Sequence, residues 1–217
     1  MTVQPKRHTM VKVCGITRLE DGRAAVEAGA DWLGFVIEHE SPRALAAGAI
    51  AEILAELPNA VGVGVLVAPN PDRALRLARE AGVQRLQLHR VDPEQWPLDF
   101  PLPVVFALTV TAEGTLTTPL PPLDRLVMLD TADATLAGGT GRSFPWNAAM
   151  AIAAQRPIIL AGGLDGDNVG VALEEIRPYG VDSSSRLESA PGIKDHERVR
   201  QFVAAVRRAD ARLGAGI

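Results

Sequence analysis

The sequence predicts a (β/α)8 barrel, in which eight parallel strands alternate with helices around a closed ring. Eight short apolar runs occur along the 217 residues, and most of them are followed by a segment with helical spacing. Apolar residues at consecutive positions are typical of strands buried on both faces of a parallel sheet. This element order over about 200 residues favours a closed barrel, and an open doubly wound sheet is the alternative.

Each predicted strand is rich in β-branched or other apolar residues and is bounded by glycine, proline or polar residues. The eight runs are MVKVC (10–14), DWLGFVI (31–37), VGVGVLV (61–67), RLQLH (85–89), PVVFALTV (103–110), DRLVMLD (124–130), PIILA (157–161) and YGVDSS (179–184). Together they supply all eight strands of the ring.

Six segments between or after these strands have helical spacing, and two connections do not. The predicted helices are 19–30, 46–58, 71–82, 146–155, 167–178 and 195–213. The connection 92–101 is too rich in proline for a full helix, and 111–124 reads as a loop where the fifth helix is expected. We therefore predict one barrel domain over residues 1–217, with its core at about 10–208 and a degenerate helix-five region.

Composition excludes several classes of function. With 47% hydrophobic residues and a formal net charge of −4, the chain can bury one large core and has no broad basic surface for nucleic acid. The single cysteine excludes an intrachain disulfide and a cysteine-rich metal site, and the four histidines lack metal-ligand spacing. No apolar run suits a signal peptide or a bilayer span. We expect a cytoplasmic monomer or homodimer without a membrane, metal or nucleic-acid partner.

Function in such a barrel lies at the carboxyl ends of the strands, where the following loops form an open face. The predicted strands end in polar or small residues, namely Cys14, His89, Asp130, Gly162 and the segment 182–184. These groups are therefore the candidate functional residues.

Side-chain alternation places further polar residues on the same faces. Lys12 shares a face with Cys14, and Gln87 shares one with His89, because residues two apart on a strand point the same way. A lysine below a thiol favours the thiolate and would prepare Cys14 as a base or nucleophile. The alternative for Cys14 is a small buried hydrophobic residue.

Two glycine-rich segments suggest ligand-binding loops. AGGLDGDNV (161–169) follows a strand and precedes a helix, so the backbone N–H groups near Gly162 and Gly163 can approach an anion. The run DSSSR adds hydroxyl groups and Arg186, at a place where barrels often bind phosphate. LAGGTGRSF (136–144) has the length of a flap over a ligand. The alternative for 161–169 is a tight turn, that for DSSSR is a solvated serine run, and that for 136–144 is a surface loop without a function.

Seven segments, in order along the chain, resemble the phosphoribosylanthranilate isomerase family of tryptophan biosynthesis. They are VKVCGIT (11–17), SPR (41–43), QLH (87–89), MLDT (128–131), GGTGRSF (138–144), AGGL (161–164) and YGVDSSSRLESAPGIKD (179–195). The resemblance runs from about residue 11 to 206. It implies a cofactor-free Amadori rearrangement of N-(5-phosphoribosyl)anthranilate to 1-(2-carboxyphenylamino)-1-deoxyribulose 5-phosphate.

The resemblance also implies roles for individual residues. Asp130 corresponds to the general acid that protonates the furanose ring oxygen, and Cys14 to the general base that removes the proton from C2. Arg43 corresponds to the residue that reaches the substrate carboxylate. The other implied contacts are Gln87, His89 and Gly141 for the substrate, and Gly162, Gly163, Asp182, Ser184 and Ser185 for the phosphate.

Three positions depart from the family pattern. Arg90 stands where glycine usually follows QLH, Phe106 where a lysine is frequent, and Arg186 where glycine usually follows the serines. Arg90 and Phe106 are expected to alter the charge near the mouth. The departures leave open a non-catalytic sugar-phosphate-binding barrel, or another phosphate-binding isomerase or epimerase, for example one that accepts a histidine-pathway aminoaldose.

We predict that Arg186 restores attraction for the phosphate that the missing lysine would have supplied. Arg186→Ala should then raise KM at low salt, where Coulomb attraction is least screened. Steady-state kinetics at low and high ionic strength measure the effect. An unchanged KM at low salt would reject this role.

Overall fold

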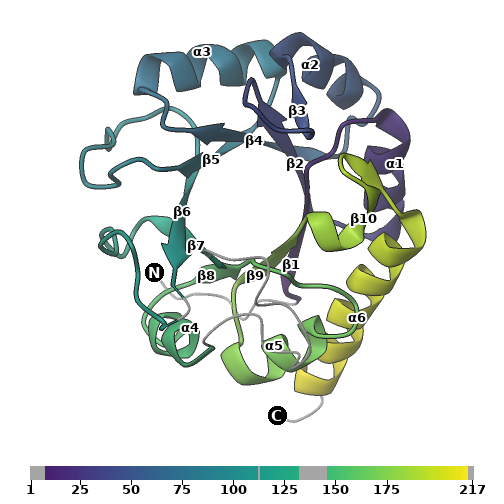
Figure 1. The fold of residues 1–217 in the computed structure, drawn as a ribbon, viewed down its shortest axis with the longest axis vertical. Coiled ribbons are helices and arrows are strands. Elements are labelled where there is room, and N and C mark those ends of the chain that lie inside the picture. Colours follow the sequence, from purple (N-terminus) through teal and green to yellow (C-terminus); the bar gives the residue numbers. More distant parts are fainter. Residues whose placement is uncertain (1–7, 112, 132–145, 215–217) are drawn as a thin grey trace.

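Eight parallel strands close into a barrel with helices around its outside (Figure 1). This computed structural model describes residues 8–111, 113–131 and 146–214. The ring order is β1 (Met10–Cys14), β9 (Gly180–Ser183), β8 (Ile158–Leu160), β7 (Leu126–Thr131), β6 (Val104–Val110), β5 (Arg85–His89), β4 (Val61–Val67) and β2 (Trp32–Ile37). Pairing of β2 with β1 completes the ring. The barrel prediction is thereby confirmed, and the open sheet is excluded.

Six helices lie where the sequence predicts them, with bounds that differ by at most three residues. They are α1 (Leu19–Ala28), α2 (Ala47–Ala55), α3 (Pro71–Ala81), α4 (Trp146–Ala153), α5 (Val169–Ile176) and α6 (His196–Gly214). In the described part of the chain, four short elements were not predicted: β3 (Ala44–Leu45), the 3-10 helix η2 (Ser185–Leu187), and the antiparallel pair β10 (Glu188–Ala190) and β11 (Ile193–Lys194). All four lie outside the strands and helices that the sequence predicts.

Local sequence signals explain the ends of the best-defined helix. The side chain of Asn70 accepts a hydrogen bond from the backbone N–H of Arg73 at 2.8 Å, and Pro71 occupies the first turn of α3. The helix ends at Gly82, whose φ of 66° lies in the left-handed region that glycine adopts without strain. The cap and the stop signal therefore set the two ends of α3.

Alternate strand positions face the inside of the barrel, and the others face the helices. The inner cluster contains Met10, Trp32, Val63, Val105, Met128, Ile159 and Ala161. A larger cluster fills the space between the strands and their outer covering. Because Val105 faces inward, its neighbour Phe106 faces outward. The expectation that Phe106 alters the charge at the mouth was therefore wrong.

Aromatic packing and one buried arginine cover the side of the barrel where two helices are missing. The ring of Trp96 meets that of Phe106 edge-on, with centroids 6.5 Å apart. The guanidinium of Arg156, which is buried, donates hydrogen bonds to the carbonyls of Pro121 at 2.6 Å and Pro122 at 2.7 Å, and to that of Arg125. The helix-less connection before β7 is thus tied to the turn between α4 and β8.

Arg156→Met should lower the free energy of unfolding by about 2–4 kcal/mol, because it leaves buried carbonyls without their charged donor. Urea denaturation of the parent and the variant measures the change. Arg200→Met is the matched control, since Arg200 pairs with Glu197 on an exposed face of α6. Equal, small effects of the two substitutions would contradict the assignment.

Candidate active site

Cys14 is the last residue of β1 and points into the barrel mouth. Its side chain is buried, with the residue 8% exposed. It lies opposite Gly34 of β2, where an added Cβ would come within 2.7 Å of Cys14 Sγ and 2.9 Å of Lys12 Nζ. Glycine at position 34 therefore leaves the space in which the thiol and the ammonium group sit together.

Lys12 lies one layer below the thiol and forms an ion pair inside the barrel. Its Nζ is 2.9 Å from Oδ1 of Asp182, and the two side chains are 1% and 8% exposed. The pair follows from register, because Lys12 of β1 is aligned with Asp182 of β9. The Asp182 carboxylate, expected on the phosphate side, is thus directed to Lys12.

Burial decides the acidity of the thiol. It raises the pKa of Cys14 above its ordinary value, and the nearby charge of Lys12, which lowers that pKa, does not offset the effect. Burial would also lower the pKa of Lys12, but Asp182 and Cys14 raise it overall. Lys12 favours the thiolate, as expected, but desolvation is the larger contribution and leaves the pKa of Cys14 above its ordinary value.

Asp130 occupies an inward-facing position near the end of β7. It is half-buried and shares its face with Met128 of the inner cluster. Strands β9 and β8 stand between β1 and β7, so Asp130 and Cys14 enter the mouth from different walls. Gly141 and the segment expected to form a flap lie outside the described residues.

Gln87 and His89 of β5 form a hydrogen-bonded pair. Their Nε2 atoms are 2.8 Å apart, and burial lowers the pKa of His89 to about 4, with a further contribution from the charge of Lys12. The imidazole is therefore neutral at neutral pH. With the Gln87 amide donating, His89 Nε2 accepts and the ring carries its proton on Nδ1. The pair can position a polar ligand, but His89 is not a resident cation.

The backbone of Arg90 explains one departure from the family pattern. Its φ of 55° lies in the left-handed region, and its side chain is exposed. Glycine adopts this conformation freely, whereas other residues do so at a cost. Arg90 therefore keeps the turn of the usual glycine and adds a charge at the rim.

Arg43 lies in the loop before β3 and is held by Glu188 of β10. Its Nε and Nη2 donate to the two carboxylate oxygens at 2.8 and 2.7 Å. Lys194 Nζ approaches the same carboxylate at 2.9 Å. A Cβ added to Gly15, next to Cys14, would meet Arg43 Cδ at 2.8 Å, so the arginine passes close to the thiol's strand end.

Sequence reasoning missed Glu188 and Lys194. Both belong to the segment YGVDSSSRLESAPGIKD, but only its first half was assigned to a site. The dipeptide Pro191–Gly192 between them is a turn signal, and it indicates the hairpin that brings the two side chains together.

The two expected phosphate loops are joined to each other. Gly162 and Gly163 have φ values of 93° and 70°, which only glycine adopts without strain. Asn168 Nδ2 donates to the carbonyl of Gly163 at 2.9 Å, and Ser183 Oγ at the end of β9 donates to that of Leu164 at 2.5 Å. The Ser183 hydrogen bond therefore joins the end of β9 to the loop after β8.

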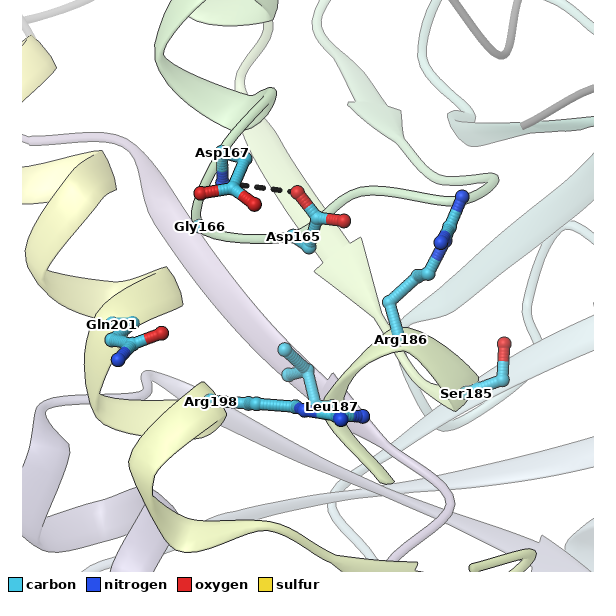
Figure 2. A pocket seen from close by; sticks show the side chains of 8 residues that line it. All are labelled: Asp165, Gly166, Asp167, Ser185, Arg186, Leu187, Arg198 and Gln201. Carbon is cyan, nitrogen blue, oxygen red and sulfur yellow. Dashed lines mark hydrogen bonds between the residues drawn. The ribbon is translucent and has the colours of Figure 1, made fainter. Parts of the chain in front are cut away.

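The serines of this region face different ways. A Cβ added to Gly15 would lie 2.9 Å from Ser184 Oγ, which places Ser184 beside the strand end that carries Cys14. Ser185 and Arg186 are exposed on η2 and line a pocket with Asp165, Asp167 and the first turns of α6 (Figure 2). Arg186 thus lines the same pocket as the β8–α5 loop and the start of α6.

The described residues contain no group of three or more histidine, cysteine, aspartate or glutamate side chains arranged to hold a metal ion. None of the helices in the described part of the chain combines the length and apolar character needed to cross a bilayer.

Fold and site together define the class of protein: a (β/α)8-barrel enzyme with titratable groups and glycine-rich loops at the carboxyl ends of its strands. The family model for N-(5'phosphoribosyl)anthranilate (PRA) isomerase matches residues 11–205. The N-(5'-phosphoribosyl)anthranilate isomerase of Geobacter sp. (strain M21) is 42% identical over 202 residues, which cover 92% of this chain and 98% of the relative. The chain belongs to the phosphoribosylanthranilate isomerase family, and the resemblance of its motifs is confirmed.

Solved structures agree with this assignment. The phosphoribosyl anthranilate isomerase of Thermus thermophilus superimposes with a TM-score of 0.77 at 36% identity, covering 92% of this chain and 99% of that one. A second isomerase structure, in complex with reduced 1-(o-carboxyphenylamino)-1-deoxyribulose 5-phosphate, gives a TM-score of 0.75 at 30% identity with the same coverage.

The native thiol should titrate at higher pH than the unfolded one, because burial raises the pKa of Cys14. Alkylation by iodoacetamide measures this without ambiguity, since the chain has a single cysteine. The rate should rise with pH in both native protein and urea-unfolded chain, with the native inflection at higher pH. Restricted access alone would lower the rate without moving the inflection, and coincident inflections would contradict the prediction.

Proposed function

We propose that this protein catalyses the Amadori rearrangement of N-(5-phosphoribosyl)anthranilate to 1-(2-carboxyphenylamino)-1-deoxyribulose 5-phosphate, with Asp130 as general acid and Cys14 as general base. The observation that carries the proposal is the placement of both groups at inward-facing strand ends of one barrel mouth, in a chain of this family. Acid and base acting on neighbouring ring atoms must approach from different sides, as β7 and β1 allow.

Ring opening is the first step. The Asp130 carboxylic acid donates its proton to the furanose ring oxygen, the bond from C1 to that oxygen breaks, and the nitrogen lone pair forms the Schiff base at C1. The acid is left as a carboxylate. The rearrangement is redox-neutral within the substrate and needs no oxidant or reductant. Side chains of this protein supply the proton transfers.

Proton removal from C2 is the second step. The Cys14 thiolate takes the proton, and the C–H electrons form the C1–C2 double bond of an enolamine as the nitrogen recovers its lone pair. The ketose forms when the C2 hydroxyl loses its proton and C1 gains one. A thiol with a raised pKa is a stronger base once deprotonated, although less of it is deprotonated at neutral pH.

The remaining residues bind and position the substrate. The loops at Gly162–Gly163 and Ser184–Ser185 hold the phosphate by backbone and hydroxyl donors. Asp182 acts indirectly, because its carboxylate keeps Lys12 charged beneath the thiol. Gln87 and the neutral His89 contact the sugar, and Arg43 receives the carboxylate of the anthranilate ring.

The decisive experiment follows the loss of anthranilate-type fluorescence with freshly prepared substrate. Cys14→Ser and Asp130→Asn should each lower kcat by about 10²-fold or more, as expected for general acid and base groups. Asp99→Asn is the control, because Asp99 is exposed between β5 and β6. A parent-like rate in either variant would remove that residue from its role. Binding without turnover by the parent would instead identify a sugar-phosphate-binding barrel.

A further inference from the structure

Glu188 is a buried carboxylate at the mouth to which the proposed chemistry assigns no step. It is the first residue of β10 and is paired across the hairpin with Lys194 of β11. The hairpin lies on the rim beside α1 (Figure 1). The Glu188 side chain is 4% exposed, whereas the side chain of Arg43, which Glu188 binds, is 25% exposed.

Charge in this cluster is presented to the mouth through Arg43. The Glu188 carboxylate lies between two cations, Arg43 and Lys194, so the three side chains carry one excess positive charge. Lys194 is fully buried and also donates to the carbonyl of Ser184 at 3.1 Å. Because Arg43 is the accessible member, the excess charge is available to an anion there.

The way in which Glu188 binds Arg43 leaves a second binding edge. A guanidinium has two edges that can each form two parallel hydrogen bonds. Glu188 occupies the edge made by Nε and Nη2. Nη1 donates no hydrogen bond to the described part of the chain, so the edge made by Nη1 and the outer Nη2 hydrogen can bind another carboxylate.

The hairpin that carries Glu188 is fixed to two other parts of the rim. Asp21 of α1, which is buried, accepts hydrogen bonds from the backbone N–H of Lys194 at 3.1 Å and from His196 at 2.8 Å. The turn at Gly192, with φ 80°, lies against Pro42: an added Cβ would come within 2.8 Å of the Pro42 carbonyl oxygen. Glu188 is therefore held rigidly with respect to the Arg43 loop.

We propose that Glu188 is a positioning residue that determines specificity: it holds Arg43 with its second edge toward the mouth, so that the site selects substrates whose aromatic ring carries a carboxylate. This inference rests on the proposed function. It assigns to Glu188 and Lys194 a part in recognition that acts entirely through Arg43.

Glu188→Gln is the most informative variant. An amide offers one oxygen to the guanidinium and turns a donor toward the other nitrogen, so Arg43 loses its fixed orientation. KM for the anthranilate substrate should rise about 10-fold or more, with kcat changed less than about 3-fold, because binding is lost equally in ground and transition states. KM for the analogue made from aniline, which lacks the carboxylate, should change less than about 2-fold.

Two controls separate positioning from a structural role. Glu174→Gln removes a Glu–Arg pair of matched kind between α5 and α6, away from the mouth, and should leave both KM values unchanged. Arg43→Lys keeps the positive charge but lacks the second edge. It should show the same selective loss, and adding Glu188→Gln to it should have little further effect.

Equal losses on both substrates, or a full effect of Glu188→Gln in the Arg43→Lys background, would overturn the inference. Equilibrium binding of the product, compared with its counterpart lacking the carboxylate, gives the same discrimination where turnover is absent. A parent that binds the product more tightly than the counterpart lacking the carboxylate, but does not turn over the substrate, would reject the proposed function and leave the role of Glu188 supported. Whether or not the parent turns over the substrate, Glu188→Gln must reduce the preference for the compound that carries the carboxylate.

Discussion

The ion pair between Lys12 and Asp182 is the interaction on which the site depends. Two charges are held inside the barrel, one on the first strand and one on the last, and each is tolerable there only because of the other. The pair also joins β1 to β9, so the seam where the chain's two ends meet is fixed beneath the mouth. Cys14 sits directly above it, in space left by Gly34. The environment of the thiol is thus set by the same contact that aligns the closing strands.

At the mouth, the cations Lys12, Lys194 and Arg43 each pair with a buried carboxylate. Lys12 is matched by Asp182, and Lys194 and Arg43 share Glu188. This arrangement keeps cations close to the Cys14 thiol while limiting the cost of burying them. Since the accessible end of the arrangement is a guanidinium, the site is suited to planar anions. The thiol and the accessible guanidinium therefore lie in one polar region of the mouth.

Covering a barrel does not require a helix after every strand. The connections around β6 lack helices, and their place is taken by the rings of Trp96 and Phe106 and by the carbonyl contacts of Arg156. Proline-rich chain has few backbone donors, so its carbonyls need an outside donor when they are buried. A single arginine satisfies several of them at once. The irregular side of the barrel is thus stabilised by side chains instead of by helical hydrogen bonds.

The sequence by itself determined the order of strands and helices and the strand-end positions of Cys14 and Asp130, because apolar periodicity, turn residues and helix caps are local signals. The motifs determined the family for the same reason. Only the tertiary structure decided that burial outweighs the charge of Lys12 at the thiol, since desolvation depends on what surrounds a group in space. It also decided that Arg43 is bound by Glu188. These residues are 145 positions apart, and a short hairpin, stabilised by contacts with distant parts of the chain, brings them together.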